Sequence, residues 1–149
     1  MATIYLAGPI DKVSAESAST WREEAGRILA VEFNHVVCDP NRTWVTNPET
    51  RGRHLPRENA AIVSADLSAV SAVDALLVFS DKNTLACGTY IEVGYAYSLN
   101  KTIAFFTTGI FPGFVLGLAY DNEKIHCFSN LRNACEWLNY SLGWHPTDN

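Results

Sequence analysis

The 149-residue chain has 11 lysine and arginine residues against 16 aspartate and glutamate residues, and its formal net charge is −5. The length fits one domain spanning residues 1–149, and a hydrophobic share of 48% excludes a disordered chain. An acidic balance repels nucleic-acid backbones and anionic membranes, so neither a nucleic-acid polymer nor a membrane is expected as a partner.

The start of the chain lacks the basic and cleavable apolar segments of a secretory signal, which predicts a cytoplasmic protein. The four cysteines form no C-x-x-C pair and have no histidine cluster near them in sequence, so no metal site is expected. Residues 102–120 are uncharged and long enough to span a bilayer, but three glycines and a proline interrupt them. We expect this stretch to be buried in the fold or in a subunit interface.

Short apolar runs alternate with helical patterns along the chain, as is typical of an α/β fold. The runs predict strands at residues 3–7, 35–38, 75–79, 102–107 and 124–128. Helices are expected to open at Thr20-x-x-Glu23 and to cover residues 56–72, 89–99 and 130–142. This pattern predicts a doubly wound, five-stranded parallel sheet of order 2-1-3-4-5, flavodoxin-like or Rossmann-like, with helices on both faces. Ligands then bind at the loops 8–13 and 80–89, beyond the carboxyl ends of the first and third strands.

A long polar loop follows the second predicted strand and collects several of the few cations. It holds Arg42, Arg51 and Arg53, and Arg57 lies just beyond it. These side chains suit a phosphate clamp, and Trp44 in the same loop suits stacking on a base. A solvated loop in which Trp44 packs on the core explains the same residues without a ligand.

Asp66 lies within the apolar stripe of the helix predicted at 56–72, four residues after Ile62 and four before Val70. A buried carboxylate is costly unless it is paired, so a partner or a ligand is expected. A backbone N–H group or an arginine near the sheet edge would satisfy it equally well.

Glu92 allows two interpretations. The spacing Thr89-x-x-Glu92 matches a capping box, in which Glu92 only bonds a backbone N–H group. The same position also puts a carboxylate at the start of a helix that faces the crevice. Gly8 and Gly88 permit close approach of a ligand, but no G-x-G-x-x-G or Walker pattern is present, and no cofactor is expected.

Three segments together resemble the nucleoside 2-deoxyribosyltransferase family, over about residues 3–107. They are Ile4-Tyr5-Leu6-Ala7-Gly8-Pro9-Ile10, Asp66-Leu67, and Gly88-Thr89-x-x-Glu92-x-Gly94-Tyr95-Ala96 followed by Lys101. The resemblance implies that Glu92 attacks the anomeric carbon, that Asp66 helps to hold the base and the catalytic groups, and that Tyr5 orients Glu92. We expect the substrate to be bound by Gly8, Pro9, Ile10, Arg42, Trp44, Gly88 and Thr89.

A carboxylate nucleophile predicts a retaining double displacement, in which a glycosyl ester of Glu92 is released by a second base or by water. The resemblance implies a homo-oligomeric, metal-independent enzyme of nucleotide salvage that transfers deoxyribose between nucleobases. Transferases of the family usually carry Asp six residues before the nucleophile, and the related nucleoside 5′-monophosphate N-glycosidases carry Ser. This chain has Ala86 there, so hydrolysis of a nucleotide remains an alternative. A non-catalytic nucleotide-binding module is the other alternative.

Overall fold

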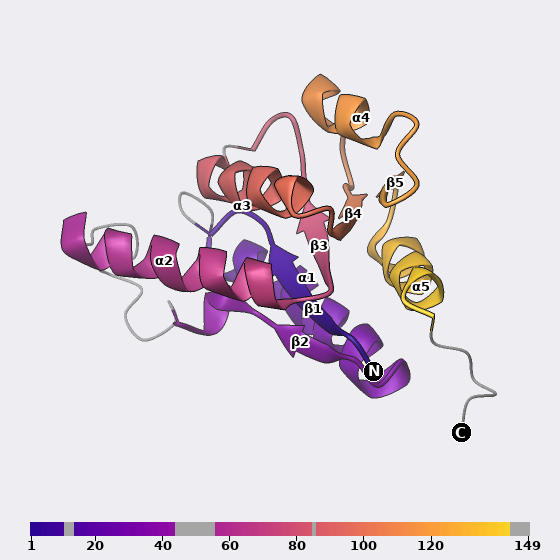
Figure 1. Ribbon diagram of the computed structural model, residues 1–149, viewed down its shortest axis with the longest axis horizontal. Helices are drawn as coiled ribbons and strands as arrows, with labels where there is room; N and C mark the ends of the chain where they lie inside the picture. Colours follow the sequence, from indigo (N-terminus) through magenta and orange to yellow (C-terminus); the bar gives the residue numbers. More distant parts are fainter. Residues whose placement is uncertain (11–13, 44–55, 85, 144–149) are drawn as a thin grey trace.

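A five-stranded parallel sheet forms the centre of the computed structural model, which describes residues 1–10, 14–43, 56–84 and 86–143 (Figure 1). The strands are β1 Thr3–Ala7, β2 Val36–Cys38, β3 Ala75–Phe79, β4 Thr102–Phe106 and β5 Ile125–Phe128. Their order is β2-β1-β3-β4-β5, and every neighbouring pair is parallel. The predicted fold class and strand order are therefore confirmed.

Helical segments connect each strand to the next, and a last helix follows β5. They are α1 Ala15–Gly26, which continues into the π-helical segment η1 Arg27–Glu32, the 3₁₀ turn η2 Pro40–Thr43, α2 Pro56–Ala72, α3 Cys87–Ser98, α4 Gly113–Ala119 and α5 Leu131–Ser141. The predicted start of the first helix at Thr20 is wrong. Ser14 is the N-cap, because its hydroxyl accepts a hydrogen bond from the backbone N–H of Ser17.

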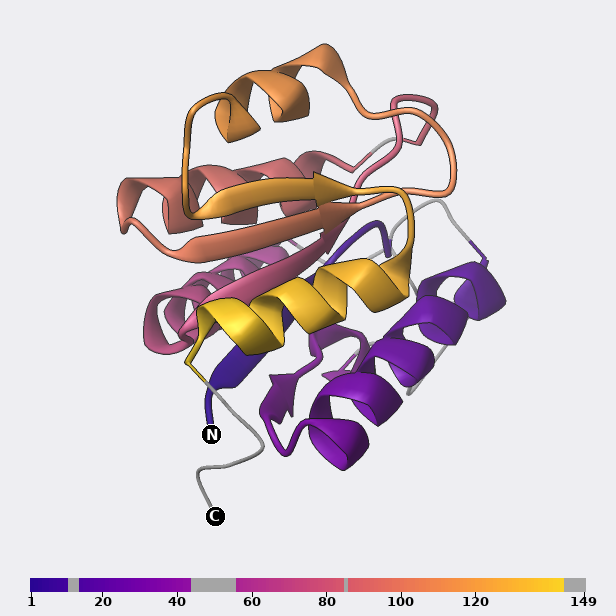
Figure 2. The ribbon, with the colours of Figure 1, turned by 90° about the vertical axis from the view of Figure 1, so that its right-hand side faces the viewer.

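Side chains alternate between the two faces of each strand and build two cores. Figure 2 shows the helices that cover the two faces of the sheet. Ile4 and Leu6 of β1 pack with residues of α1, η1 and α5. Tyr5 and Ala7 point to the other face and pack with residues of α2, α3 and α4. As a result, Tyr5 faces the layer that contains α3.

The uncharged stretch 102–120 divides between a buried and an exposed part. β4 lies between β3 and β5 in the sheet, and its residues Ile103–Phe106 are buried. Beyond it, Ile110, Phe114, Leu116 and Tyr120 are exposed. Within the described ranges, no helix has both the length and the apolar character needed to cross a membrane.

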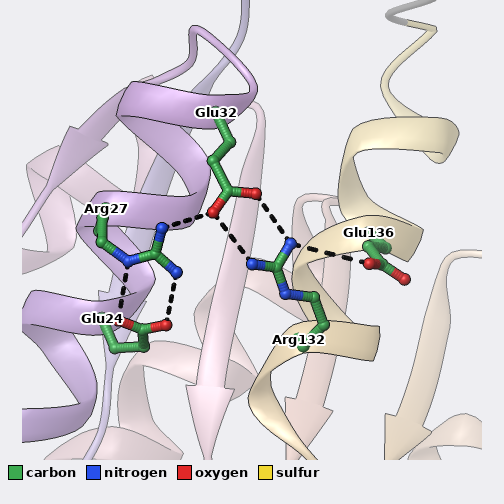
Figure 3. A network of polar contacts seen from close by, with 5 residues as sticks. All are labelled: Glu24, Arg27, Glu32, Arg132 and Glu136. Atoms are coloured by element: carbon green, nitrogen blue, oxygen red, sulfur yellow. Dashed lines mark hydrogen bonds and ion pairs between the residues drawn. The ribbon is translucent and has the colours of Figure 1, made fainter.

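A chain of ion pairs joins α1 and η1 to α5 (Figure 3). The Glu32 carboxylate accepts hydrogen bonds from Arg27 at 2.6 Å and from two nitrogens of Arg132 at 2.8 and 2.9 Å. Arg27 also donates to Glu24, and Arg132 lies 3.8 Å from Glu136. Hydrogen bonds from Arg132 and Arg27 lower the pKa of Glu32 to about 2.

We expect Glu32→Gln to lower the melting temperature modestly at pH 7, with a difference that shrinks as the pH falls towards 2. A carboxyl group whose pKa is lowered by folding stabilises the fold above its ordinary pKa, and this contribution is lost as the pH falls through the folded value. Because the network is exposed, the effect is small and weakens with salt. Thermal unfolding at several pH values and salt concentrations measures it. Equal melting temperatures at pH 7 and low salt would contradict the prediction.

Candidate active site

The carboxyl end of β1 and the helix α3 bring two predicted site residues into direct contact. The hydroxyl of Tyr5 donates a hydrogen bond to Oε1 of Glu92, with 3.0 Å between the two oxygens. Tyr5 is fully buried, and Glu92 is partly buried. Residues 87 positions apart in sequence thus meet where the topology predicts a ligand site.

The beginning of α3 differs from the prediction. The helix starts at Cys87 with Ala86 as its N-cap, and no side chain caps it. Thr89 therefore lies inside the first turn, and Glu92 follows in the second. The capping-box interpretation is wrong, because Thr89 is not the N-cap and the Glu92 side chain accepts a hydrogen bond from Tyr5 of β1.

Burial dominates the electrostatics of Glu92. Removal of the carboxyl group from water raises the pKa of Glu92 to about 7, and the charge of Asp66 acts in the same direction. The hydrogen bond from Tyr5 and the charge of Arg22 oppose this rise. Burial and the neighbouring Glu92 charge also hold the pKa of Tyr5 far above its ordinary value, so the phenol stays protonated as a donor.

Asp66 supplies a second carboxyl group from α2. Its side chain is half-buried, and burial raises its pKa, whereas the charge of Arg22 lowers it. Its charge in turn raises the pKa values of both Glu92 and Tyr5. Asp66 is therefore close enough to Tyr5 and Glu92 to interact with both, and we expect its ligand to bind beside this pair.

Sequence analysis missed Arg22, which is buried in α1 with 2% of its surface exposed. Its guanidinium donates from Nη1 to the carbonyl oxygen of Leu6 at 2.9 Å and to Oδ1 of Asp39 at 3.0 Å, and from Nη2 to the carbonyl oxygen of Gly8 at 2.9 Å. The available signal was its place in the stripe formed by the buried residues Ala18, Ala25 and Leu29. A cation within such a stripe implies a partner, as does an aspartate.

Gly8, Pro9 and Ile10 follow β1 at its carboxyl end, and the first two are buried. Gly8 has a packing role of its own. A Cβ atom added there would lie 2.7 Å from the Cζ2 atom of Trp21, whereas one added at Gly88 meets nothing within 4 Å. Of these two positions, only position 8 needs glycine for lack of space, because the Trp21 ring leaves no room for a side chain there.

We expect Gly8→Ala to lower the free energy of unfolding by about 1–3 kcal/mol, because either the Trp21 ring or the chain after β1 has to shift. Gly88→Ala is the matched control. It lies in open space within α3 and should leave stability unchanged or raise it by up to about 1 kcal/mol through helix propensity. Urea unfolding of both variants measures the contrast. A Gly8→Ala variant as stable as the Gly88→Ala variant would contradict it.

The remaining predicted residues are only partly placed. Thr89 is buried and Gly88 is exposed in the first turn of α3. The backbone of Arg42 belongs to η2 after β2, but its side chain is outside the described part of the structure, as are Trp44 and the other loop cations before α2. The predicted phosphate clamp thus stays a prediction. Among the described residues, no His, Cys, Asp and Glu side chains form a group of three that would hold a metal ion.

Comparison with known proteins assigns the class. The family model of nucleoside 2-deoxyribosyltransferases matches residues 4–126. The chain therefore belongs to the nucleoside 2-deoxyribosyltransferase family, as its three motifs predict. No curated protein matches it by sequence.

Solved structures share the fold at low sequence identity. The 2-deoxyribosyltransferase of Bacillus psychrosaccharolyticus is 21% identical with a TM-score of 0.64, and the match covers 89% of each chain. The CMP N-glycosidase of Clostridium botulinum is 16% identical with a TM-score of 0.57, covering 93% of this chain and 98% of that one. A conserved protein from Enterococcus faecalis is 17% identical with a TM-score of 0.69, covering 95% and 99%.

Proposed function

We propose that the protein cleaves the N-glycosidic bond of a 2′-deoxynucleoside, with Glu92 as the nucleophile, and transfers the sugar to another nucleobase. The observation that carries this proposal is the 3.0 Å hydrogen bond from Tyr5 to Glu92 at the carboxyl end of the sheet. The bond engages Oε1 and orients the carboxylate, and in the proposed reaction an oxygen of this carboxylate attacks the sugar. Family membership supports the same class of reaction.

The proposed reaction is a double displacement. An oxygen of ionised Glu92 forms a bond to the anomeric carbon while the bond to the base nitrogen breaks, and the electron pair leaves with the base. Asp66, whose pKa is raised by burial, donates a proton or a hydrogen bond to the departing base. A nitrogen of the incoming base then attacks the same carbon, the N–H proton of that base passes to Asp66, and the Glu92 carboxylate is released.

A second candidate reaction, hydrolysis of a nucleoside 5′-monophosphate, is favoured by the beginning of α3. Ala86 at the N-cap offers no side chain to the first-turn N–H groups. Uncapped N–H groups and the helix dipole bind anions. An aspartate at position 86 would repel a phosphate, whereas Ala86 leaves this helix end open to one. In this reaction water replaces the incoming base in the second step.

One set of incubations tests these reactions. The protein is incubated with deoxynucleosides, and separately with their 5′-monophosphates, each with and without an acceptor base, and products are separated by chromatography. An exchanged nucleoside supports transfer, and free base formed without acceptor supports hydrolysis. Ligand-induced thermal stabilisation with no base release over long incubation would overturn both and favour a binding module.

We also propose that the protein is a homo-oligomer. α3, its C-cap residue and α4 lie on the same face of the sheet and expose apolar side chains to solvent, namely Ile91, Tyr95, Tyr97, Leu99, Phe114 and Leu116. Exposed apolar residues in this number are typical of a subunit interface. Sedimentation velocity should detect a dimer or a larger assembly, and a monomer across the micromolar range would contradict it.

A further inference from the structure

Arg22 contacts the candidate active site from the opposite layer of the sheet. α1 packs on the face formed by Ile4 and Leu6, whereas Glu92 and Asp66 come from the helices on the other face. The guanidinium nevertheless reaches the carboxyl end of β1, where it bonds the carbonyl oxygens of Leu6 and Gly8. Leu6 follows Tyr5 within β1, and Gly8 is the first residue after the strand ends at Ala7.

The hydrogen bonds from Arg22 to Leu6 and Gly8 hold the backbone of β1 in place next to Tyr5. Leu6 is the neighbour of Tyr5, and the Gly8 carbonyl is held by Nη2 of the same guanidinium group at 2.9 Å. The Trp21 ring lies against Gly8 and also stacks with Arg22, whose Cζ atom is 4.6 Å from the ring centroid. A shift of Arg22 would therefore move the end of β1, and with it the phenol that bonds Glu92.

Arg22 also supplies positive charge to the site. In the described part of the chain, the groups that act on the Glu92 carboxyl are Tyr5 of β1, Asp66 of α2 and Arg22 of α1, and only Arg22 is cationic. Asp39, which follows β2, partly neutralises this charge, because its carboxylate forms an ion pair with Arg22 at 3.0 Å. Cys38, which precedes Asp39 in sequence, raises the pKa of Tyr5 through its charge.

A contribution to the stability of the fold does not explain why an arginine is buried at position 22. Nε of Arg22 is buried and has no hydrogen-bond partner among the described residues. An unsatisfied buried donor is costly, and an apolar side chain of similar volume often stabilises a fold as well as a buried ion pair does. A role at the site accounts for the presence of the charge.

We propose that Arg22 is a positioning residue, which holds the end of β1 beneath Tyr5 and sets the charge balance of the Glu92 and Asp66 carboxylates in partnership with Asp39. The functional consequence rests on the proposed function, since it concerns the ionisation of the proposed nucleophile. Arg22 itself touches neither sugar nor base in this scheme.

Two substitutions test the proposal because they shift the charge in opposite directions. Arg22→Gln removes the cation, so Glu92 should ionise at higher pH. Asp39→Asn keeps the shape and an acceptor oxygen for Arg22 but leaves the cation uncompensated, so Glu92 should ionise at lower pH. Each shift is expected to be roughly one pH unit. Arg27→Gln, which removes an exposed arginine adjoining the same helix, is the matched control and should leave Glu92 unchanged.

The titration is followed by the ¹³C carboxyl signal of Glu92, assigned by its loss in Glu92→Gln, and by the acid limb of kcat/KM. Opposite shifts support the proposal. Unchanged midpoints, or shifts in one direction, in folded variants would overturn it. If Arg22→Gln does not fold, a downward shift in Asp39→Asn supports the proposal and an unmoved midpoint overturns it. The carboxyl signal requires no turnover, so an inactive protein overturns the proposed function without deciding this one.

Discussion

Glu92→Gln is expected to abolish base release from every nucleoside and nucleotide tested, with a loss of at least about 10³-fold in kcat/KM. Glutamine has the same shape and can still accept the hydrogen bond of Tyr5, so the site keeps its geometry. Its amide cannot form the glycosyl ester or balance positive charge on the sugar. Initial rates of base release, measured by chromatography on both proteins, check this prediction.

Glu123→Gln is the matched control for that substitution. Glu123 is exposed and precedes β5, at the edge of the sheet opposite the carboxyl ends that form the candidate site. The control should keep full activity, and circular dichroism should show both variants folded. Base release by folded Glu92→Gln at more than about a tenth of the normal rate would contradict a nucleophilic role.

The acid limb of the pH profile should lie near neutrality. A nucleophilic carboxylate must be ionised, and burial raises the pKa of Glu92 to about 7. We therefore expect kcat/KM to fall about tenfold for each pH unit below 7, and to fall again at higher pH where Asp66 loses the proton that it gives to the departing base. Measurements between pH 5 and 9 in buffers of constant ionic strength check this. An acid limb near pH 4.5 would mean that the carboxyl group is not desolvated in the working enzyme.

The same titration has the opposite effect on stability. A carboxyl group with a raised pKa holds its proton more tightly when folded, so the fold loses stability as the pH rises from about 4.5 to about 7. Glu92→Gln has no such loss and should be more stable than the unmodified protein at pH 8, by up to about 3 kcal/mol. At pH 4 the two proteins should unfold at similar urea concentrations. A constant difference across this range would contradict the shifted pKa.

Much of the fold follows from local patterns in the sequence. The apolar runs of β1 and β3 give those strands their observed bounds, because a strand buried on both faces has few polar residues. The start of α1 was missed because Ser14 and Thr20 both precede acidic residues, and only tertiary packing decides between them. The π-helical segment η1 has no comparable sequence signal.

The site was predictable where a motif names the residue and unpredictable where packing sets its properties. The resemblance implied that Tyr5 orients Glu92, and the two side chains are hydrogen-bonded. The pKa of Glu92 depends on burial, on the hydrogen bond from Tyr5 and on the charges of Asp66 and Arg22, which no spacing in the sequence reveals. The sequence shows Arg22 as a cation within an apolar stripe. Its hydrogen bonds to the carbonyl groups of Leu6 and Gly8 depend on how α1 packs on the sheet, which the sequence pattern does not reveal.

Capture of the glycosyl-enzyme intermediate tests the central claim most directly. The protein is incubated with a deoxynucleoside or its 5′-monophosphate, quenched in acid, digested and analysed by mass spectrometry. A nucleophilic Glu92 predicts that the peptide containing Glu92 gains the mass of one sugar residue, and that the gain is absent in Glu92→Gln. Base release with no modified peptide at any quench time, or with the sugar on another residue, would contradict the assignment of Glu92 as the nucleophile.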